Sequence, residues 1–94
     1  MTVNLKFLGA LRHISGKNQL ALDCHEGASI LNILDTLTMQ APALRRNLLD
    51  EQLETPKPNA LILVNGKEIS VLNGLDTKVK DGDEVVFVPI VHGG

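Results

Sequence analysis

Ser29-Ile-Leu-Asn-Ile-Leu-Asp-Thr-Leu37 is the stretch of sequence that decides the fold. Its large apolar residues recur at i, i+3, i+4 and i+7, the spacing that places side chains on one face of a helix. They are Ile30, Ile33, Leu34 and Leu37. Ser29 precedes them directly, and its hydroxyl can accept a hydrogen bond from a free amide at the start of a helix. The sequence therefore predicts one amphipathic helix that begins after Ser29.

Upstream of this helix, apolar and polar residues alternate with the period of two that is typical of half-buried strands. Residues 3–7 show this pattern first, and residues 20–24 show it again. Gly16-Lys17-Asn18 lies between them and supplies turn residues. We expect these two strands to pair as a hairpin.

Downstream of the helix, Pro42 ends it or opens a short second helix that runs to Leu48 and Leu49. Residues 50–58 are polar, contain two prolines and show no periodicity, which predicts a loop.

The remaining sequence predicts three further strands. Residues 60–64 form an apolar run that ends at Asn65-Gly66, a strong hairpin signal because both residues tolerate positive φ. A short strand is expected over residues 67–70. A last strand is expected over residues 84–88, ended by Pro89, which cannot pair through its own nitrogen.

This order of elements predicts an α+β fold with a mixed sheet of four or five strands, one main helix and a short second helix. A hairpin followed by a crossover helix forces a later strand to lie parallel to an earlier one. One helix can cover only one face of such a sheet. We expect a single domain over residues 1–89 and an extended tail over residues 90–94.

The uncovered face of this sheet should carry aliphatic side chains. If Phe7 and Phe87 point toward the helix, then Leu8, Val86 and Val88 point the other way. Such residues can be ordinary surface, since over half of a protein's accessible area is apolar. Grouped exposed aliphatic residues also mark docking sites. The position of Val88 near the tail favours docking, because a partner on this face would also receive the tail.

Composition excludes several classes of protein. Nine basic and eleven acidic residues give a net charge of −2, which is too balanced for a nucleic-acid or membrane-surface binder. The first residues lack the pattern of a signal peptide, and no apolar stretch approaches the ~20 residues that span a bilayer. We therefore expect a cytoplasmic protein.

No constellation of residues points to catalysis or to a metal. Cys24 is the only cysteine, and we expect it to be a small core residue rather than a nucleophile. Adjacent Cys24 and His25 would point to opposite faces of a strand and could not bind one ion together. The other histidines, His13 and His92, lie in a predicted loop and in the tail. We expect no metal site and no enzymatic activity of the chain alone.

The sequence ends in Gly93-Gly94. A carboxylate on two residues without side chains can enter a narrow channel and be attacked at its carbonyl carbon, which nothing shields. Counted from Ile90, the extended tail reaches roughly 17 Å. The alternative is a frayed end without function, which is common at chain termini.

Several segments together resemble the MoaD-like proteins, the β-grasp, ubiquitin-like small subunits of molybdopterin synthase. The segments are Leu11-Arg12 after the first strand, the helix after Ser29, Leu63-Val64-Asn65-Gly66, Gly74-Leu75-Asp76-Thr77, Asp81-Gly82-Asp83-Glu84-Val85, and Phe87 to Gly94. The resemblance covers nearly the whole chain and is most specific in its last third. ThiS carriers share the tail, but the length around residues 42–58 is more similar to the MoaD-like and small archaeal modifier branches.

The resemblance implies a non-catalytic carrier. An activating enzyme of the MoeB or ThiF type would use ATP to adenylate Gly94, and a sulfur donor would convert it to a thiocarboxylate. The tail, Ile90, Val91, His92 and Gly93, would then enter a MoaE-like large subunit that binds the pterin precursor. Leu8 and Val88, with Val86, would dock these partners. The resemblance implies no permanently bound cofactor.

Two alternatives stay open. The same adenylate would serve a protein modifier joined through Gly94 to lysines of target proteins, and a β-grasp binding module could end in Gly-Gly by chance. The tail also departs from the family pattern of Pro-Pro-Val, a small residue and Gly-Gly: Ile90 replaces the second proline and His92 the small residue. We expect this tail to be more flexible before binding and bulkier near the mouth of a channel.

Overall fold

The computed structural model describes residues 1–50 and 57–90. Its main sheet has five strands in the order β2-β1-β7-β5-β6. Their bounds are Thr2–Phe7 (β1), Gln19–Asp23 (β2), Ala60–Val64 (β5), Lys67–Glu68 (β6) and Glu84–Pro89 (β7). The central strands β1 and β7 are parallel, and the other neighbours are antiparallel. The predicted mixed sheet with one parallel pair is therefore confirmed.

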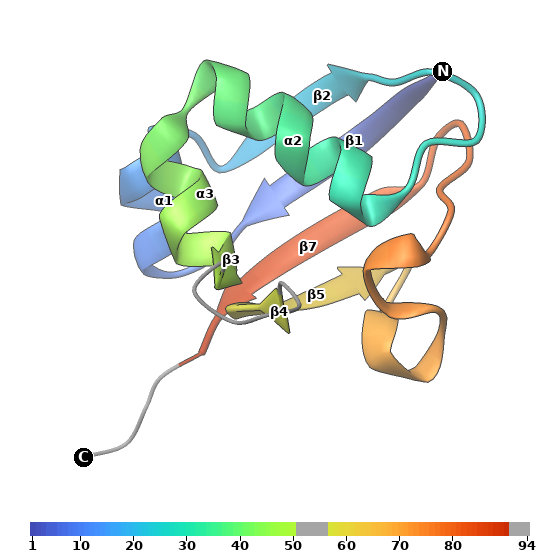
Figure 1. Ribbon diagram of the computed structural model, residues 1–94. Coiled ribbons are helices and arrows are strands. Elements are labelled where there is room, and N and C mark those ends of the chain that lie inside the picture. Colours follow the sequence, from blue (N-terminus) through green and yellow to red (C-terminus); the bar gives the residue numbers. More distant parts are fainter. Residues whose placement is uncertain (51–56, 91–94) are drawn as a thin grey trace.

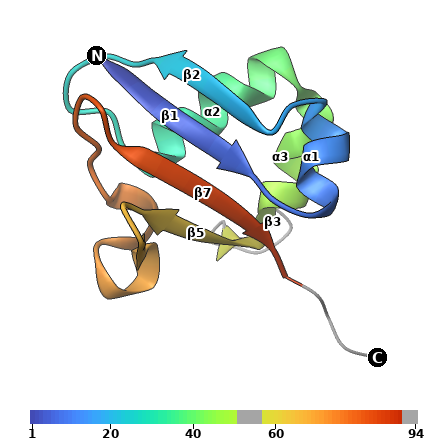
Figure 2. The same ribbon diagram turned by 180° about the vertical axis from the view of Figure 1, so that it is seen from behind.

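Helices cover one face of this sheet and leave the other face open. The long helix α2 (Ile30–Gln40) crosses the sheet, while α1 (Ala10–Ser15) and α3 (Pro42–Leu48) pack at one end of it. The opposite view shows the strands in front, α2 and α3 behind them, and α1 at one end of the sheet (Figures 1 and 2). This is the predicted β-grasp arrangement, with a main helix held by a mixed sheet.

The core lies between α2 and the covered face of the sheet. Alternate residues of the central strands are at most 1% exposed, and the apolar stripe of α2 is at most 2% exposed. These residues are Val3, Leu5, Phe7, Val85, Phe87, Ile30, Ile33, Leu34 and Leu37. The rings of Phe7 and Phe87 stack with centroids 5.4 Å apart. The predicted inward faces of both strands and of the helix are thus confirmed.

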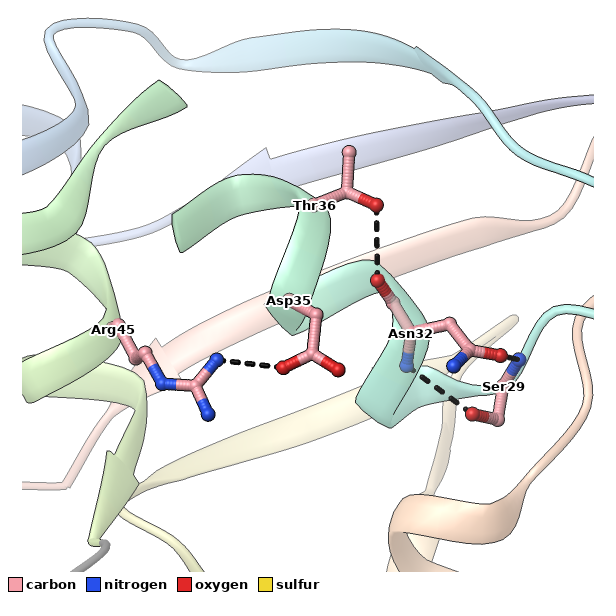
Figure 3. A network of polar contacts seen from close by, with 5 residues as sticks. All are labelled: Ser29, Asn32, Asp35, Thr36 and Arg45. Carbon is pink, nitrogen blue, oxygen red and sulfur yellow. Dashed lines mark hydrogen bonds and ion pairs between the residues drawn. The ribbon is translucent and has the colours of Figure 1, made fainter. Parts of the chain in front are cut away.

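A reciprocal pair of hydrogen bonds starts α2 (Figure 3). The Ser29 hydroxyl accepts the amide N–H of Asn32 at 3.2 Å, and the Asn32 side-chain oxygen accepts the amide N–H of Ser29 at 3.0 Å. Two donors that a helix start leaves free are satisfied in this way. Farther along, Arg45 of α3 pairs with Asp35 of α2 at 2.6 Å and ties the two helices together.

Replacing Ser29 by alanine should lower the stability of the domain by about 1 kcal/mol, because the first turn of α2 loses its cap. For a domain of this size the melting temperature should fall by roughly 4–8 °C. The melting temperature is measured from thermal unfolding monitored by circular dichroism. Ser29→Thr keeps a hydroxyl and should stay close to the wild type. Equal melting temperatures of the alanine variant and the wild type would contradict the role of the cap.

The connection between β1 and β2 differs from the predicted turn. The strands pair antiparallel as expected, but the helix α1 lies between them and contains His13, which therefore does not lie in a loop as predicted. Helix α1 buries only Leu11, so it lacks the repeating apolar stripe that reveals a helix in a sequence. The one feature of the sequence that indicates this helix is Gly16, which ends it in the left-handed conformation at φ 76°.

Three other segments also differ in detail. The predicted strand over residues 67–70 is β6 followed by a 3₁₀ turn, Ile69–Val71. The short second helix ends at Leu48, and Leu49, predicted as its last residue, begins β3 (Leu49–Asp50). This strand pairs with β4 (Lys57–Pro58) at the two ends of the predicted loop, and residues 51–56 lie outside the described residues. The last strand is predicted from the sequence to end before Pro89. In the structure Pro89 is the last residue of β7 and lies opposite Ala60.

The boundary between domain and tail stays a prediction. The described chain continues through Pro89 to Ile90, and residues 91–94, the rest of the predicted tail, lie outside the described residues.

Candidate functional site

An apolar patch lies on the open face of the sheet. Val86 and Val88 of β7 point away from the core, and Leu63 and Leu61 of β5 lie directly opposite them. Leu8 follows β1 and donates its amide N–H to the carbonyl of Phe87 at 3.0 Å, which holds it beside the end of β7. We call Leu8, Leu61, Leu63, Val86 and Val88 the open-face patch. The strands that carry it are in front in Figure 2.

The members of the open-face patch are accessible to different degrees. Leu8 is 42% exposed and Leu61 is 39% exposed, whereas Val86 and Val88 are half-buried by their neighbours. The structure thus brings together the three patch residues predicted from the sequence, Leu8, Val86 and Val88. A continuous row of exposed or half-exposed aliphatic side chains of this kind is typical of a protein contact surface.

Sequence reasoning missed Leu61 and Leu63. Residues 60–64 are all apolar, so the alternation between faces is invisible in their polarity. In the structure Ala60, Ile62 and Val64 are buried, which leaves Leu61 and Leu63 on the other side. Counting back from the hairpin at Asn65-Gly66 could have assigned the faces, because a two-residue turn fixes the register of its strands.

Charged side chains flank the patch. Lys6 of β1 and Glu84 of β7 form an ion pair with 2.9 Å between Nζ and Oε2. Glu68 lies opposite Leu63 and accepts hydrogen bonds from the hydroxyl and the amide of Ser70, which lower the pKa of its carboxyl. An apolar centre with a polar rim is the usual anatomy of a protein interface.

The chain leaves the sheet beside this patch. Ile90, the first tail residue, is 46% exposed and lines a groove of about 310 Å³ together with Leu61 and Ile69. Ile90 is the only predicted tail residue within the described part of the chain; Val91, His92, Gly93 and Gly94 lie outside it. A partner that covers Val88 would therefore also meet the root of the tail.

Within residues 1–50 and 57–90, no three His, Cys, Asp or Glu side chains come together in a way that could hold a metal ion. Cys24 packs against the edge of the core, and burial raises the pKa of its thiol. None of the helices in this part of the chain has the length and apolar character needed to cross a bilayer.

The described residues form a β-grasp domain with an apolar patch beside the end of its last strand, the fold of its solved ubiquitin-like neighbours. Comparison with known families agrees. The chain belongs to the ThiS family, whose model matches residues 5–94.

Similar proteins carry names from the modifier branch. Small archaeal modifier protein 3 of Haloferax volcanii is 29% identical over 94 residues, which is the full length of both chains. Ubiquitin-related modifier 1 homolog 2 of Arabidopsis thaliana is 36% identical over 74 residues, covering 70% of this chain and 75% of that protein.

Solved structures share the fold. Small archaeal modifier protein 1 of Methanosarcina acetivorans is 35% identical, with a TM-score of 0.81 over 99% of this chain and 96% of that one. A chain of the BexX/CysO complex of Amycolatopsis orientalis is 27% identical, with a TM-score of 0.77 over 98% of this chain and 99% of that one. A Pyrococcus furiosus protein assigned as molybdopterin converting factor subunit 1 is 21% identical, with a TM-score of 0.74 over 96% and 99%, and supports the fold alone.

The family resemblance and the β-grasp fold predicted from the sequence are therefore confirmed. The chain is a member of a family of ubiquitin-like sulfur carriers and modifiers, which are small and in general non-catalytic.

Proposed function

We propose that this chain is a sulfur carrier whose working group is the carboxylate of Gly94. The observation that carries the proposal is the position of the open-face patch, which reaches Val88, one residue before Pro89 and two before the tail begins. A partner that binds the patch would keep the folded domain outside its active site, and the tail could then enter that site. Membership of the ThiS family supports the same role.

The reaction requires only that the terminal carboxylate of the carrier be accessible and that the residues next to it be small. An activating enzyme of the MoeB or ThiF type supplies ATP, and a Gly94 carboxylate oxygen attacks the α-phosphorus and releases pyrophosphate. The acyl-adenylate has a good leaving group, so hydrosulfide adds at the carbonyl carbon and expels AMP. The product is a C-terminal thiocarboxylate. ATP belongs to the activating enzyme, and the carrier holds no resident cofactor.

Mass spectrometry tests this proposal directly. After incubation with a MoeB-type enzyme, ATP and sulfide, the chain should gain about 16 Da at its last residue, the difference between sulfur and oxygen. A parallel reaction without ATP should leave the mass unchanged. If an enzyme that activates its own carrier leaves this chain unmodified, the proposal is wrong.

For the sulfur acceptor, we propose the pterin precursor in a MoaE-like large subunit, so that the chain would be the small subunit of molybdopterin synthase in molybdenum cofactor biosynthesis in the cytoplasm. Thiocarboxylated chain mixed with such a subunit and the precursor should lose its added sulfur to the pterin. Retention of the sulfur under these conditions would contradict this acceptor.

A second candidate is conjugation of Gly94 to lysines of target proteins, which the modifier names of the relatives favour. The last lysine or arginine of the chain is Lys80, so trypsin would leave residues 81–94 on a modified lysine rather than Gly-Gly alone. A search for that branched peptide in cells distinguishes the two fates. Its presence on several proteins would favour modification over sulfur transfer to a pterin.

A further inference from the structure

We infer that Gly9 is a positioning residue that fixes the direction in which the tail leaves the sheet at Pro89. The inference rests on the proposed function, because direction matters only if the tail must enter a partner. It assigns a role to two residues outside the open-face patch, each next to one of its members: Gly9 follows Leu8, and Pro89 follows Val88.

The backbone around Gly9 ends the parallel pairing of β1 and β7. Leu8 donates its amide N–H to the carbonyl of Phe87 at 3.0 Å, and the next bond of a parallel ladder would come from the amide of residue 89. Pro89 has no amide N–H. The carbonyl of Leu8 instead accepts the amide N–H of Leu11 at 3.1 Å, which begins α1. The ladder therefore stops, and α1 starts, at the same point.

Gly9 fits against the ring of Pro89. Its φ is +56°, and a Cβ atom placed on it would lie 2.9 Å from Cγ and 3.5 Å from Cδ of Pro89. The first of these distances is shorter than real Cβ contacts, so a larger residue at position 9 requires the Pro89 ring or the backbone beside it to shift. On its other side Pro89 lies opposite Ala60, which is 4% exposed. The last residue of β7 is thus held between two small residues.

This contact connects the patch to the root of the tail. The patch sets where the partner lies, and the Gly9–Pro89 contact sets the point and angle from which the tail starts. Once a partner holds the tail extended, a change at its root would shift the position of its end, and displacements of about 1 Å can cost up to about 100-fold in rate. Gly9 should therefore affect the reaction of Gly94 more than the binding of the partner.

Three variants separate the contact with Pro89 from the backbone strain that a side chain meets at positive φ. Gly9→Ala adds the Cβ that meets Pro89. Gly74→Ala is a control for positive φ alone, because Gly74 has φ +57° and its Cβ would meet nothing within 4 Å, whereas Gly9 also has ψ −138°. Pro89→Ala removes the ring atoms and also restores an amide N–H beside the carbonyl of Leu8, so it serves as the reference chain: Gly9→Ala is measured both in the otherwise unchanged chain and together with Pro89→Ala, each against its own background.

Adenylation kinetics at varied carrier concentration provide the first readout. Gly9→Ala should lower kcat about tenfold and change KM by less than about twofold, because the patch is intact. Gly74→Ala should keep both constants, and Gly9→Ala should have little further effect once Pro89→Ala is present. A wild-type kcat for Gly9→Ala, or an equal loss with and without Pro89→Ala, would overturn the inference.

A measurement on the free chain, without the activating enzyme, distinguishes failure of the inference from failure of the proposed function. Residual dipolar couplings of the Ile90 amide should change in Gly9→Ala, while those of β2 and α2 should not. Unchanged Ile90 couplings would overturn the inference alone. A wild-type chain that is never adenylated would overturn the proposed function, and the role of Gly9 in activation with it, whatever the couplings show.

Discussion

A chain extended by one alanine after Gly94 is expected to be activated at least about 100-fold more slowly than the wild type. The extension moves the terminal carboxylate by roughly 3.3–3.6 Å along an extended tail. Displacement of a reacting group by even about 1 Å can cost about 100-fold in rate. It also places a side chain where the sequence has only Gly93 and Gly94. Release of pyrophosphate, measured with a MoeB-type enzyme and ATP, reports the rate.

The same variant contains its own control for folding and docking. The added residue lies beyond β7, so the melting temperature should equal that of the wild type. The open-face patch is unchanged, so the extended chain should compete with the wild type for the activating enzyme. An extended chain that is adenylated at the normal rate would show that Gly94 is not the reacting residue.

Local patterns were sufficient to predict the framework of the fold. The stripe from Ile30 to Leu37 and the capping residue Ser29 define α2, because a helix of this length buries one face along its whole course. The alternation of apolar and polar residues predicts the strand β1, and the Asn65-Gly66 turn predicts a hairpin. Each of these signals needs only a few consecutive residues. In all of these cases, neighbours in the sequence determine the structure.

The parts that could not be predicted depend on contacts between distant segments. Helix α1 is short, and only Leu11 is buried in it, so tertiary packing rather than periodicity supports it. The outward faces of Leu61 and Leu63 depend on their register against β7. The approach of Gly9 to Pro89 joins residues that are far apart in the chain, and a glycine in the sequence does not reveal which side chain fills the space beside it.

The second large effect is expected for Val88→Asp, which should weaken the binding of the activating enzyme by about 2 kcal/mol, or about 30-fold. Burial of an aliphatic side chain in an interface is lost, and a carboxylate must be desolvated without a partner. The effect should appear in KM rather than in kcat, in contrast to Gly9→Ala. Because Val88 is half-buried on the open face, the free domain should lose no more than about 1 kcal/mol of stability.

Met39→Asp is the matched control for this variant. Met39 is also apolar and is 87% exposed, but it lies on α2, on the opposite side of the sheet from the patch. It should leave KM unchanged and lower the melting temperature only slightly, because an acidic residue in the last turn of α2 opposes the helix dipole. A loss of binding confined to Val88→Asp then assigns docking to the open face rather than to added charge. An unchanged KM for Val88→Asp would mean that the partner binds elsewhere. A collapse of its melting temperature would place Val88 in the core, and the apolar row on β5 and β7 would then serve the fold rather than a partner.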